Sequence, residues 1–562
     1  MSARGEVGKM HKATAGYDRP AGDPHASRST VMAPHGMVAT SQPLATEVGL
    51  HVLRSGGNAV DAAVAANAVL GVVEPHNCGI GGDLFAIVWR AQSKRLHGLN
   101  ASGRSPGNLM LEEFRRRGLS AIPGSGPLSW SAPGCVDGWE QLVRRFGTRS
   151  LGELLEPAID YAQRGFPVSE IISAQWVGAE DALRKRSGSA KIYLRDGRAP
   201  RPGEVFRNPA LARTYRVLAK EGADGFYRGS VARRLVAYSR SVGGFFSLAD
   251  LSEHRCEWVE PVSTTYRGRE IWEIPPNCQG IAVLQMLRIL EGFDLATLGH
   301  NTAPYLHLLI EAKKIVFEDR ARYYADPAFA RIPIAELLSD ERAKAHRALI
   351  NPDRAMRLPI KGHAPTAIQD ETVYLCAVDR WRNAVSLIQS NYGGFGSFEV
   401  PPELGFCIQN RGCSFSLNPQ HANVFAPRKR PFHTIIPGFV TERGKPLLAF
   451  GVMGGDMQPQ GHVQVLCSLL DFEMTVQQAG DAARFRHDGS SDPRGQVGRG
   501  TGMVLLESRI PRSVRAGLRG LGHKIGYSPG AFGGYQAILI DPATSMLHGG
   551  TDPRKDGCAA GY

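Results

Sequence analysis

The stretch that decides the fold is TAIQDETVYLCAVDRWRNAVSLIQSNYGGFGS, residues 366–397. Within it, residues 373–378 are apolar and partly β-branched, residues 379–383 are typical of a turn, and residues 384–390 are largely apolar again. This pattern predicts a hairpin of two buried strands. Thr372 stands at the start of the first of them.

Thr372 taken alone has two interpretations. Threonine is common in strands because its branched side chain suits a pleated surface, so the residue can be purely structural. Threonine can also act as a nucleophile, but its hydroxyl then needs an adjacent base. The residues around it favour the second interpretation.

The segment that begins at Thr372 resembles the start of the small subunit of γ-glutamyltranspeptidases, a family of N-terminal-nucleophile (Ntn) hydrolases. The family pattern is T-x-x-x-x-V-V-D-x-x-G-N-A-V, and this chain departs from it at Ala377 and Arg382. The resemblance implies that the precursor cleaves itself between Glu371 and Thr372, so that Thr372 becomes both the nucleophile and a new N-terminus. The matching residues are Thr372, Val378, Asp379, Asn383, Ala384 and Val385.

The chemistry of a threonine nucleophile suits such a cleavage. A free α-amino group has a pKa of roughly 7.7–8.0, so it accepts a proton near neutral pH far better than a lysine does. Cutting the Glu371–Thr372 bond therefore creates the base and delivers the nucleophile together. The first step would be attack of Thr372 Oγ1 on the Glu371 carbonyl, an N-to-O acyl shift, and water would then release the ester.

Further motifs of the same family follow in order along the chain. SGGNAVDAA at 55–63 and GIGG at 79–82 match its N-terminal part, and DPRKDG at 552–557 matches its end. A glycine-rich run such as 79–82 can cradle phosphate, but no Gly-Lys-Ser/Thr follows it, which argues against a nucleotide site.

Two motifs resemble the catalytic machinery of the family. GVMGGD at 451–456 matches the oxyanion-hole loop, in which Gly454 and Gly455 would let backbone N–H groups approach the developing oxyanion. The resemblance also implies that the hydroxyl of Ser390 bonds to the hydroxyl of the nucleophile.

Positions that hold the γ-glutamyl substrate in the family differ here. Ser102 stands where those enzymes keep an Arg for the α-carboxylate. Arg104, two residues away, either substitutes for that Arg or is a surface turn residue. Ser414 stands where they keep an Asp for the α-ammonium, and Arg411 adds a cation. A carboxylate-bearing substrate would suit this balance of charge.

Three more candidates come from the same comparison of patterns. Tyr392 stands where the family keeps a substrate-binding Asn. The adjacent Asn391 could take that role, but a shift by one residue along a strand turns a side chain to the other face. Of two hydroxyls that hold the α-carboxylate in the family, Thr434 keeps one and His433 replaces the other. The candidate substrate-binding residues are Arg104, Asn391, Tyr392, Arg411, Ser414, His433 and Thr434.

Composition limits the remaining classes. The 562 residues carry a net charge of +13, yet the basic clusters at 115–117 and 428–430 lack a nucleic-acid motif, so a solvated basic surface is favoured over nucleic-acid binding. The nine cysteines form no C-x-x-C and are odd in number, which argues against a disulfide framework or zinc site and favours a reducing compartment. We expect no metal and no cofactor.

The chain ends and the central linker give further expectations. The first thirty residues are polar and lack the apolar region of a signal peptide, which favours the cytoplasm. No run of eighteen apolar residues suggests a membrane helix. Residues 58–61 are predicted to start an Ala-rich helix that runs to about Val73, and residues 127–330 are predicted to be mostly helical, with a helix at 281–290. Cys376 and Cys407 lie in apolar runs and are predicted to be in the core. The polar run 346–367 is predicted to become the loose tail of the large fragment.

The resemblance implies a fold of the α+β class, a four-layer αββα Ntn-hydrolase sandwich with two antiparallel sheets. Residues 1–30 would be a flexible leader, residues 31–371 the large fragment and residues 372–562 the small fragment, the two forming one intertwined domain. The expected partners are these two fragments and a small-molecule amide. A homodimer of such two-fragment units stays open.

The predicted activity is that of an autoprocessing, γ-glutamyltransferase-like enzyme related to glutathione hydrolases. It would pass the acyl group of an amide through acyl-Thr372 to water or an amine. Residues 386–392, SLIQSNY, resemble oxamate amidohydrolase and cephalosporin acylase, so a small carboxylate-bearing amide such as oxamate is an alternative substrate. An Ntn-fold binding protein without activity is a further alternative.

Overall fold

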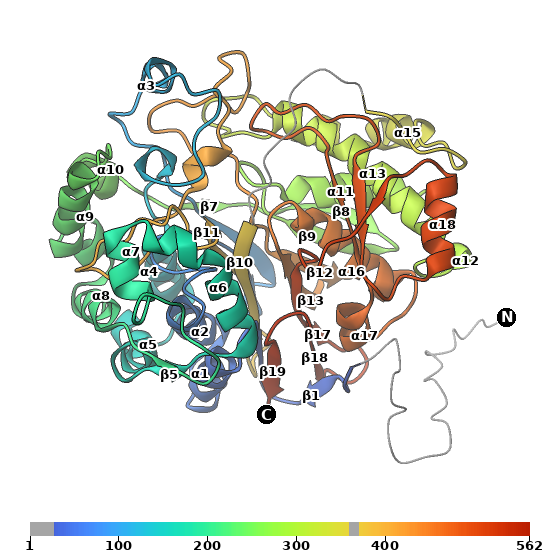
Figure 1. The fold of residues 1–562 in the computed structure, drawn as a ribbon. Helices are drawn as coiled ribbons and strands as arrows, with labels where there is room; N and C mark the ends of the chain where they lie inside the picture. Colours follow the sequence, from blue (N-terminus) through green and yellow to red (C-terminus); the bar gives the residue numbers. More distant parts are fainter. Residues whose placement is uncertain (1–26, 359–369) are drawn as a thin grey trace.

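The computed structural model describes residues 27–358 and 370–562, so nearly all of the predicted leader and part of the predicted tail at 346–367 lie outside the described residues. Two sheets of seven strands lie face to face between two layers of helices (Figure 1). Neighbouring strands are antiparallel throughout both sheets. The predicted four-layer sandwich is confirmed.

The first sheet has the predicted hairpin at its centre. Its second strand, β11, is buried along its whole length, as the apolar run predicts. The sheet order is β19 (Cys558–Gly561), β2 (Met37–Thr40), β10 (Asp370–Val378), β11 (Ala384–Gly393), β3 (Asp83–Arg90), β4 (Arg95–Ala101) and β7 (Glu257–Val259).

The second sheet faces the first through β13 and β17, which contact the hairpin strands. Both sheets combine strands from before and after Thr372, because β10 pairs with β2 and β12 pairs with β9. The order is β1 (Val31–Ala33), β18 (Leu547–Thr551), β17 (Gly534–Ile540), β13 (Lys445–Met453), β12 (Gly438–Glu442), β9 (Arg269–Glu273) and β8 (Val262–Tyr266).

The helical layer over the first sheet is built on α2, whose residues are all buried. α2 starts after Asn58, as predicted, and a capping box closes its N-terminus: Asn58 Oδ1 accepts from the Asp61 N–H at 3.1 Å, and the Asp61 carboxylate accepts from the Asn58 N–H at 2.9 Å. The helices of this side of the molecule are α1 (Pro43–Arg54), α2 (Ala59–Val73), α3 (Leu111–Arg116), α4 (Cys135–Phe146), α5 (Leu151–Arg164), α6 (Glu170–Arg184), α7 (Ser187–Tyr193), α8 (Pro209–Tyr227), α9 (Ser230–Ser241) and α10 (Leu248–Ser252).

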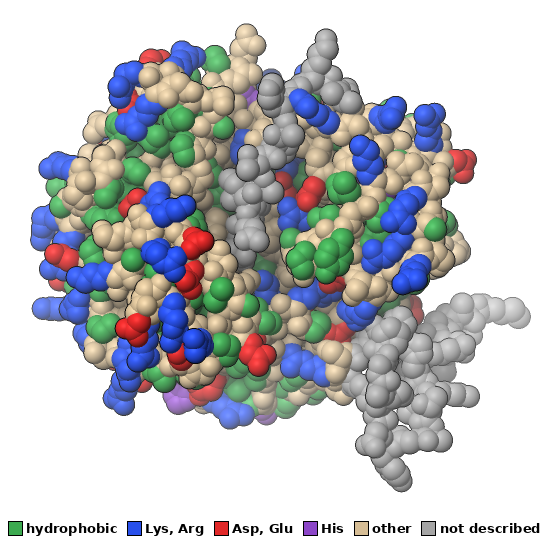
Figure 2. Space-filling model, in the orientation of Figure 1, with side chains coloured by type: hydrophobic (Ala, Val, Ile, Leu, Met, Phe, Trp, Pro, Cys, Tyr) green, Lys and Arg blue, Asp and Glu red, His purple; other side chains and the backbone are tan. Residues whose placement is uncertain are grey.

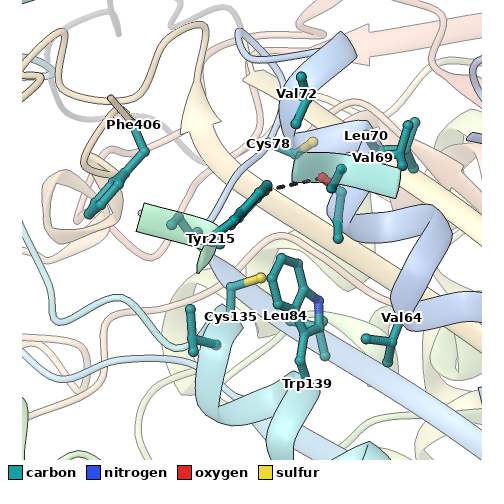
Figure 3. Close-up of a cluster of buried hydrophobic side chains, with 14 of the residues drawn as sticks. Val64, Val69, Leu70, Val72, Cys78, Leu84, Cys135, Trp139, Tyr215 and Phe406 are labelled. Atoms are coloured by element: carbon teal, nitrogen blue, oxygen red, sulfur yellow. Dashed lines mark hydrogen bonds between the residues drawn. The ribbon is translucent and has the colours of Figure 1, made fainter. Parts of the chain in front are cut away.

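The core of this layer contains large aromatic side chains held by hydrogen bonds. Trp139 and Tyr215 lie in a cluster with Val64 and Leu84 (Figure 3). The Tyr215 hydroxyl donates to the Ala68 carbonyl at 3.1 Å, so its polar end is satisfied inside the apolar cluster. Cys376 and Cys407, predicted to lie in the core, are both buried.

The second helical layer packs on the other sheet through α11, α16 and α17. The predicted helix at 281–290 is α11. The helices of this side are α11 (Gly280–Leu290), α12 (Leu295–Leu298), α13 (Ala303–Tyr323), α14 (Ile334–Leu337), α15 (Asp340–Ala348), α16 (Met457–Leu470), α17 (Val476–Asp481) and α18 (Arg512–Gly520). Two small sheets, β14 (Phe485–Asp488) with β15 (Met503–Leu506) and β16 (Ile525–Gly526), and β5 (Phe166–Pro167) with β6 (Val205–Phe206), complete the fold.

Residues 127–330 are mostly helical, as predicted, and they also contain the short strands β5 to β9, which were not predicted individually. Arg267 and Gly268 join β8 to β9, and their positive φ values are typical of a tight two-residue hairpin turn.

Two observations concern the surface charge and the length of the helices. Lys and Arg side chains are spread over the face in Figure 2 and mixed with acidic ones. Among the described residues, no helix combines the length and the apolar character that a membrane span needs.

Candidate active site

Thr372 lies at the start of β10 and is almost completely buried, with 2% of its surface exposed. Its Oγ1 donates a hydrogen bond to Ser390 Oγ at 3.3 Å. Ser390 Oγ in turn accepts from the backbone N–H of Tyr392 at 2.8 Å. The structure therefore brings together the predicted nucleophile and the predicted hydroxyl partner.

A β-bulge produces this contact. β10 and β11 pair Glu371 with Tyr392 and Val373 with Gln389, which leaves Ser390 and Asn391 opposite Thr372 alone. Bulges of this kind redirect a side chain and are frequent next to active sites. Tyr392, directly after the bulge, has a φ of 76°, an uncommon conformation for a bulky residue.

The glycine-rich run at 79–82 supports the bulge from behind. A Cβ on Gly82 would meet the carbonyl oxygen of Ser390 at 2.2 Å, so only glycine fits there. The Gln389 side chain donates to the Gly79 carbonyl at 2.7 Å and accepts from its N–H at 2.9 Å. These glycines thus hold the strand that carries Ser390.

Gly454 and Gly455 follow β13 and precede α16, with φ values of 113° and 53°. Gly454 and Thr372 line the same cleft, which has a volume of about 980 Å³. A Cβ on Gly454 would lie 3.2 Å from Gly533 Cα, so the loop approaches its neighbour closely. This position suits backbone donors for an oxyanion formed at Thr372.

Gln279 holds this glycine loop from the side of α11. Its Nε2 donates to the Gly455 carbonyl at 2.9 Å and to the Thr434 carbonyl at 2.6 Å. Its Oε1 accepts from Arg320 Nη1 at 2.6 Å, and the same Nη1 donates to the Asp456 carboxylate at 2.6 Å. No motif in the sequence marks Gln279, because its role depends on tertiary contacts.

Arg320 was missed altogether, because an Arg in an amphipathic helix carries no distinguishing sequence signal. It is 1% exposed. Burial by itself would raise the pKa of Asp456, but the charge and hydrogen bond of Arg320 outweigh burial and hold that pKa below its ordinary value. The ion pair therefore stays charged and fixes the residue that follows Gly455.

Three predicted substrate contacts lie beside the bulge. The Arg411 guanidinium lies over the Tyr392 ring at 3.8 Å and donates to Thr434 Oγ1 at 2.8 Å. Arg411 and Thr434 are both buried. The backbone N–H of Tyr392 donates to Ser390 Oγ, the atom that also accepts from the Thr372 hydroxyl. Tyr392, Arg411 and Thr434 therefore lie next to the hydrogen-bond partner of the nucleophile.

The Asn391 side chain bonds to another loop, and Ser414 is held through its backbone. The Asn391 amide donates to the Cys78 carbonyl at 2.9 Å, as expected for the residue after Ser390 on a strand. Ser414 is buried and its carbonyl accepts from Asn423 Nδ2 at 2.7 Å. Their roles as substrate contacts stay predictions.

His433 belongs to a buried network around Asp83. His433 Nε2 lies 3.0 Å from an Asp83 carboxylate oxygen, and the other oxygen accepts from the Gly103 N–H at 3.0 Å. Burial raises the pKa of Asp83 to about 7, although bonds from Gln409 and the charge of Arg411 oppose this rise. Burial and Arg411 also keep the pKa of His433 well below its ordinary value.

Arg104 lies on the far side of this network. Its Nη2 donates to Glu257 at 2.8 Å, and Arg430 Nη1 donates to the same carboxylate at 2.6 Å. Ser102 bonds to Asn100 Oδ1 at 2.7 Å. Among the described residues that line the 980 Å³ cleft there is neither Ser102 nor any of the predicted substrate-binding residues Arg104, Asn391, Tyr392, Arg411, Ser414, His433 and Thr434.

Two groups of side chains have the composition of a metal site. In one, Asp137, His254 and Cys256 lie together; in the other, His307, Glu311 and His523. Each has other partners: the Asp137 carboxylate accepts from the Cys256 N–H at 2.7 Å, and Glu311 is paired with Lys314 at 2.7 Å. None of the residues of either group is among the described residues that line the cleft with Thr372.

Comparison with known proteins gives consistent relatives. The family model described as Gamma-glutamyltranspeptidase matches residues 45–562. The chain is 38% identical to the glutathione hydrolase-like YwrD proenzyme of Bacillus subtilis, over 93% of this chain and 98% of that protein. It is 34% identical to the oxamate amidohydrolase proenzyme of Klebsiella pneumoniae, over 95% of this chain and 100% of that protein.

A solved structure matches along nearly the whole length. The cephalosporin acylase of Bacillus halodurans superposes with a TM-score of 0.88 at 40% identity, covering 98% of this chain and 99% of that one.

Proposed function

Because this chain belongs to the gamma-glutamyltranspeptidase family, whose members are proenzymes that cleave amides, we propose that it matures by cutting its own Glu371–Thr372 bond and then uses Thr372 on amide substrates. The observation that carries the proposal is the hydrogen bond from Thr372 Oγ1 to Ser390 Oγ, formed at a bulge on the wall of the cleft that Gly454 also lines.

Maturation proceeds in two steps. Thr372 Oγ1 attacks the Glu371 carbonyl carbon, the C–N bond breaks, and the Thr372 nitrogen leaves as a free amine. Water then hydrolyses the ester, which leaves Glu371 as a carboxylate and frees the Thr372 hydroxyl. Both sheets contain strands from both fragments, hydrogen-bonded to each other, which supports their staying together after the cut.

The same atoms then act on the substrate. The Thr372 α-amine accepts the hydroxyl proton as Oγ1 attacks the amide carbon, and N–H groups of the Gly454–Gly455 loop stabilise the oxyanion. The leaving amine takes the proton, and an acyl-Thr372 ester remains. Water, or an acceptor amine, releases the acyl group and restores the hydroxyl.

The acyl group of the substrate bears a carboxylate in this proposal. Arg411 supports it, because the guanidinium lies over the Tyr392 ring, next to the bulge that holds the nucleophile. An Arg recognises a planar carboxylate with paired N–H donors. The relatives named for glutathione, oxamate and cephalosporin define the amides to try.

The test compares wild-type protein with Thr372→Ala. Intact mass should show two fragments for the wild type and one chain for the variant. Hydrolysis of γ-glutamyl, oxamate and glutaryl amides should occur only with the wild type. Thr551→Ala is the matched control, since Thr551 is equally buried and its hydroxyl lacks a hydrogen-bond partner among the described residues. A cleaved, active Thr372→Ala protein would refute the proposal.

A further inference from the structure

The cleft beside Thr372 is large for a small acyl group alone. Its volume of about 980 Å³ extends from Thr372 and Gly454 to α6 on one side and to the turn that carries Lys555 on another. Ligand pockets for whole drug-sized molecules have volumes of about 300–1,000 Å³. The cleft therefore has room for the amine half of an amide as well as its acyl half.

One wall of the cleft is apolar and open. Ile171, Ala174, Gly178, Ala179 and Ala182 line it at the three- and four-residue spacing that places side chains on one face of α6. These residues are half-buried or exposed, so this face is not covered by another described element. A flat apolar group can lie against such short side chains.

The opposite charges of the cleft are mostly paired with each other. Arg486 is paired with Asp488 at 2.7 Å, and Arg554 with Glu507 at 2.5 Å. Lys555 also lines the cleft, and within the described part of the chain no carboxylate oxygen lies within 4.0 Å of its ammonium. Lys555 thus gives the cleft a positive charge that is in no ion pair of this length, although it attracts the buried Glu74 carboxylate over a longer distance.

Neighbouring contacts hold the Lys555 turn beside α6. Ser169, the residue before α6, donates to the Asp556 carboxylate at 2.6 Å. In the same wall His76 bonds to Gln175 of α6 at 2.7 Å, and burial, with a smaller contribution from the charge of Lys555, lowers the pKa of His76 to about 3, so it stays neutral. The cation and the apolar face of α6 therefore belong to one rigid surface.

We propose that this cleft selects amides whose leaving amine has an apolar body and a carboxylate, with the body against α6 and the carboxylate on Lys555. The inference rests on the proposed function, because Thr372 must cleave the amide. It adds a second anionic group to the substrate, separate from the acyl carboxylate near Arg411.

The test uses matched substrates that differ only in the leaving amine. Glutaryl and γ-glutamyl amides of 4-aminobenzoate are compared with those of 4-aminobenzamide, which has the same ring and no charge. The wild type should cleave the aminobenzoate amides with about tenfold higher kcat/KM, mostly through KM, the size expected for one charged hydrogen bond.

Variants of Lys555 then locate the preference. Lys555→Ala should remove the preference and leave the aminobenzamide rates unchanged, and Lys555→Arg should keep most of it. Lys445→Ala, at the exposed start of β13, is the control and should change nothing. Intact mass should show complete maturation of every variant.

Three outcomes would overturn the inference. Equal rates on both amines in the wild type remove the need for a carboxylate site. Equal losses on both amines in Lys555→Ala show a structural role only. Protein that fails to mature and cleaves no amide refutes the proposed function and this inference with it, whereas a matured enzyme without preference refutes this inference alone.

Discussion

Replacing Gln279 with methionine tests how the glycine loop is held. Methionine keeps the length of the side chain but removes both donors, so the Gly455 and Thr434 carbonyls lose bonds of 2.9 and 2.6 Å. Arg320 loses its 2.6 Å acceptor but keeps Asp456. The Gly455 carbonyl still accepts from the Gln458 N–H at 3.1 Å, so among the described residues the Thr434 carbonyl is the buried group left without a partner. Leaving one such group unpaired costs about 1–3 kcal/mol, and we expect a loss of that size in unfolding free energy.

The catalytic effect should exceed what lower stability explains. Loss of an oxyanion donor costs about 10²–10³ in kcat. Here the donors remain but their loop is loosened, so kcat should fall about 10- to 100-fold with little change in KM. The assay is steady-state hydrolysis of the best amide of the panel, together with the half-time of maturation followed by intact mass.

Gln285→Met is the matched control. Gln285 lies on the same helix, is 2% exposed, and bonds to Asp319 and Tyr324 at 2.8 and 2.7 Å. It should lose similar stability while keeping its kcat. Equal kcat losses in the two variants, or a normal kcat in Gln279→Met, would refute the positioning role of Gln279.

Three further predictions follow from the same site. Ser390→Ala removes the acceptor of the Thr372 hydroxyl, and we expect kcat to fall about tenfold with folding intact, measured by single-turnover kinetics and circular dichroism; an unchanged rate would contradict this role. Gly454→Ala places a Cβ at a φ of 113°, so maturation and turnover should both slow by at least tenfold, and normal maturation in a pulse-chase gel would contradict the strain argument. Because burial raises the folded pKa of Asp83 to about 7, its stabilising contribution is full below its unfolded pKa, near 3.9, and is lost as pH rises through about 7. Asp83→Asn should therefore flatten the fall in unfolding free energy between about pH 4 and pH 7 in urea titrations, and an unaltered slope would exclude Asp83 as its source.

The sequence predicts the parts of the fold that depend on local pattern. The hairpin, the capped α2 helix and α11 follow from periodicity and from cap residues such as Asn58, and the structure has them in place. The strands at 257–273 were not predicted individually. The αββα arrangement itself came from the resemblance, because contacts between sheets join residues far apart in the chain.

The same distinction applies to the site: motifs predict some of its residues, and others act only through tertiary contacts. Thr372, Ser390 and Gly454 were predicted from motifs, and the structure places them around one cleft or in direct contact. Gln279 and Arg320 act through tertiary contacts that have no sequence signature. The bulge opposite Thr372 is likewise a property of strand register, which a single sequence does not display.

The most direct test of the mechanism is N-terminal sequencing of the active, mature protein. The account predicts a chain that begins at Thr372 and continues with Val373-Tyr374-Leu375, in equal amount to the large fragment. Full amide hydrolysis by an uncleaved chain, or by fragments cut at another bond, would contradict it.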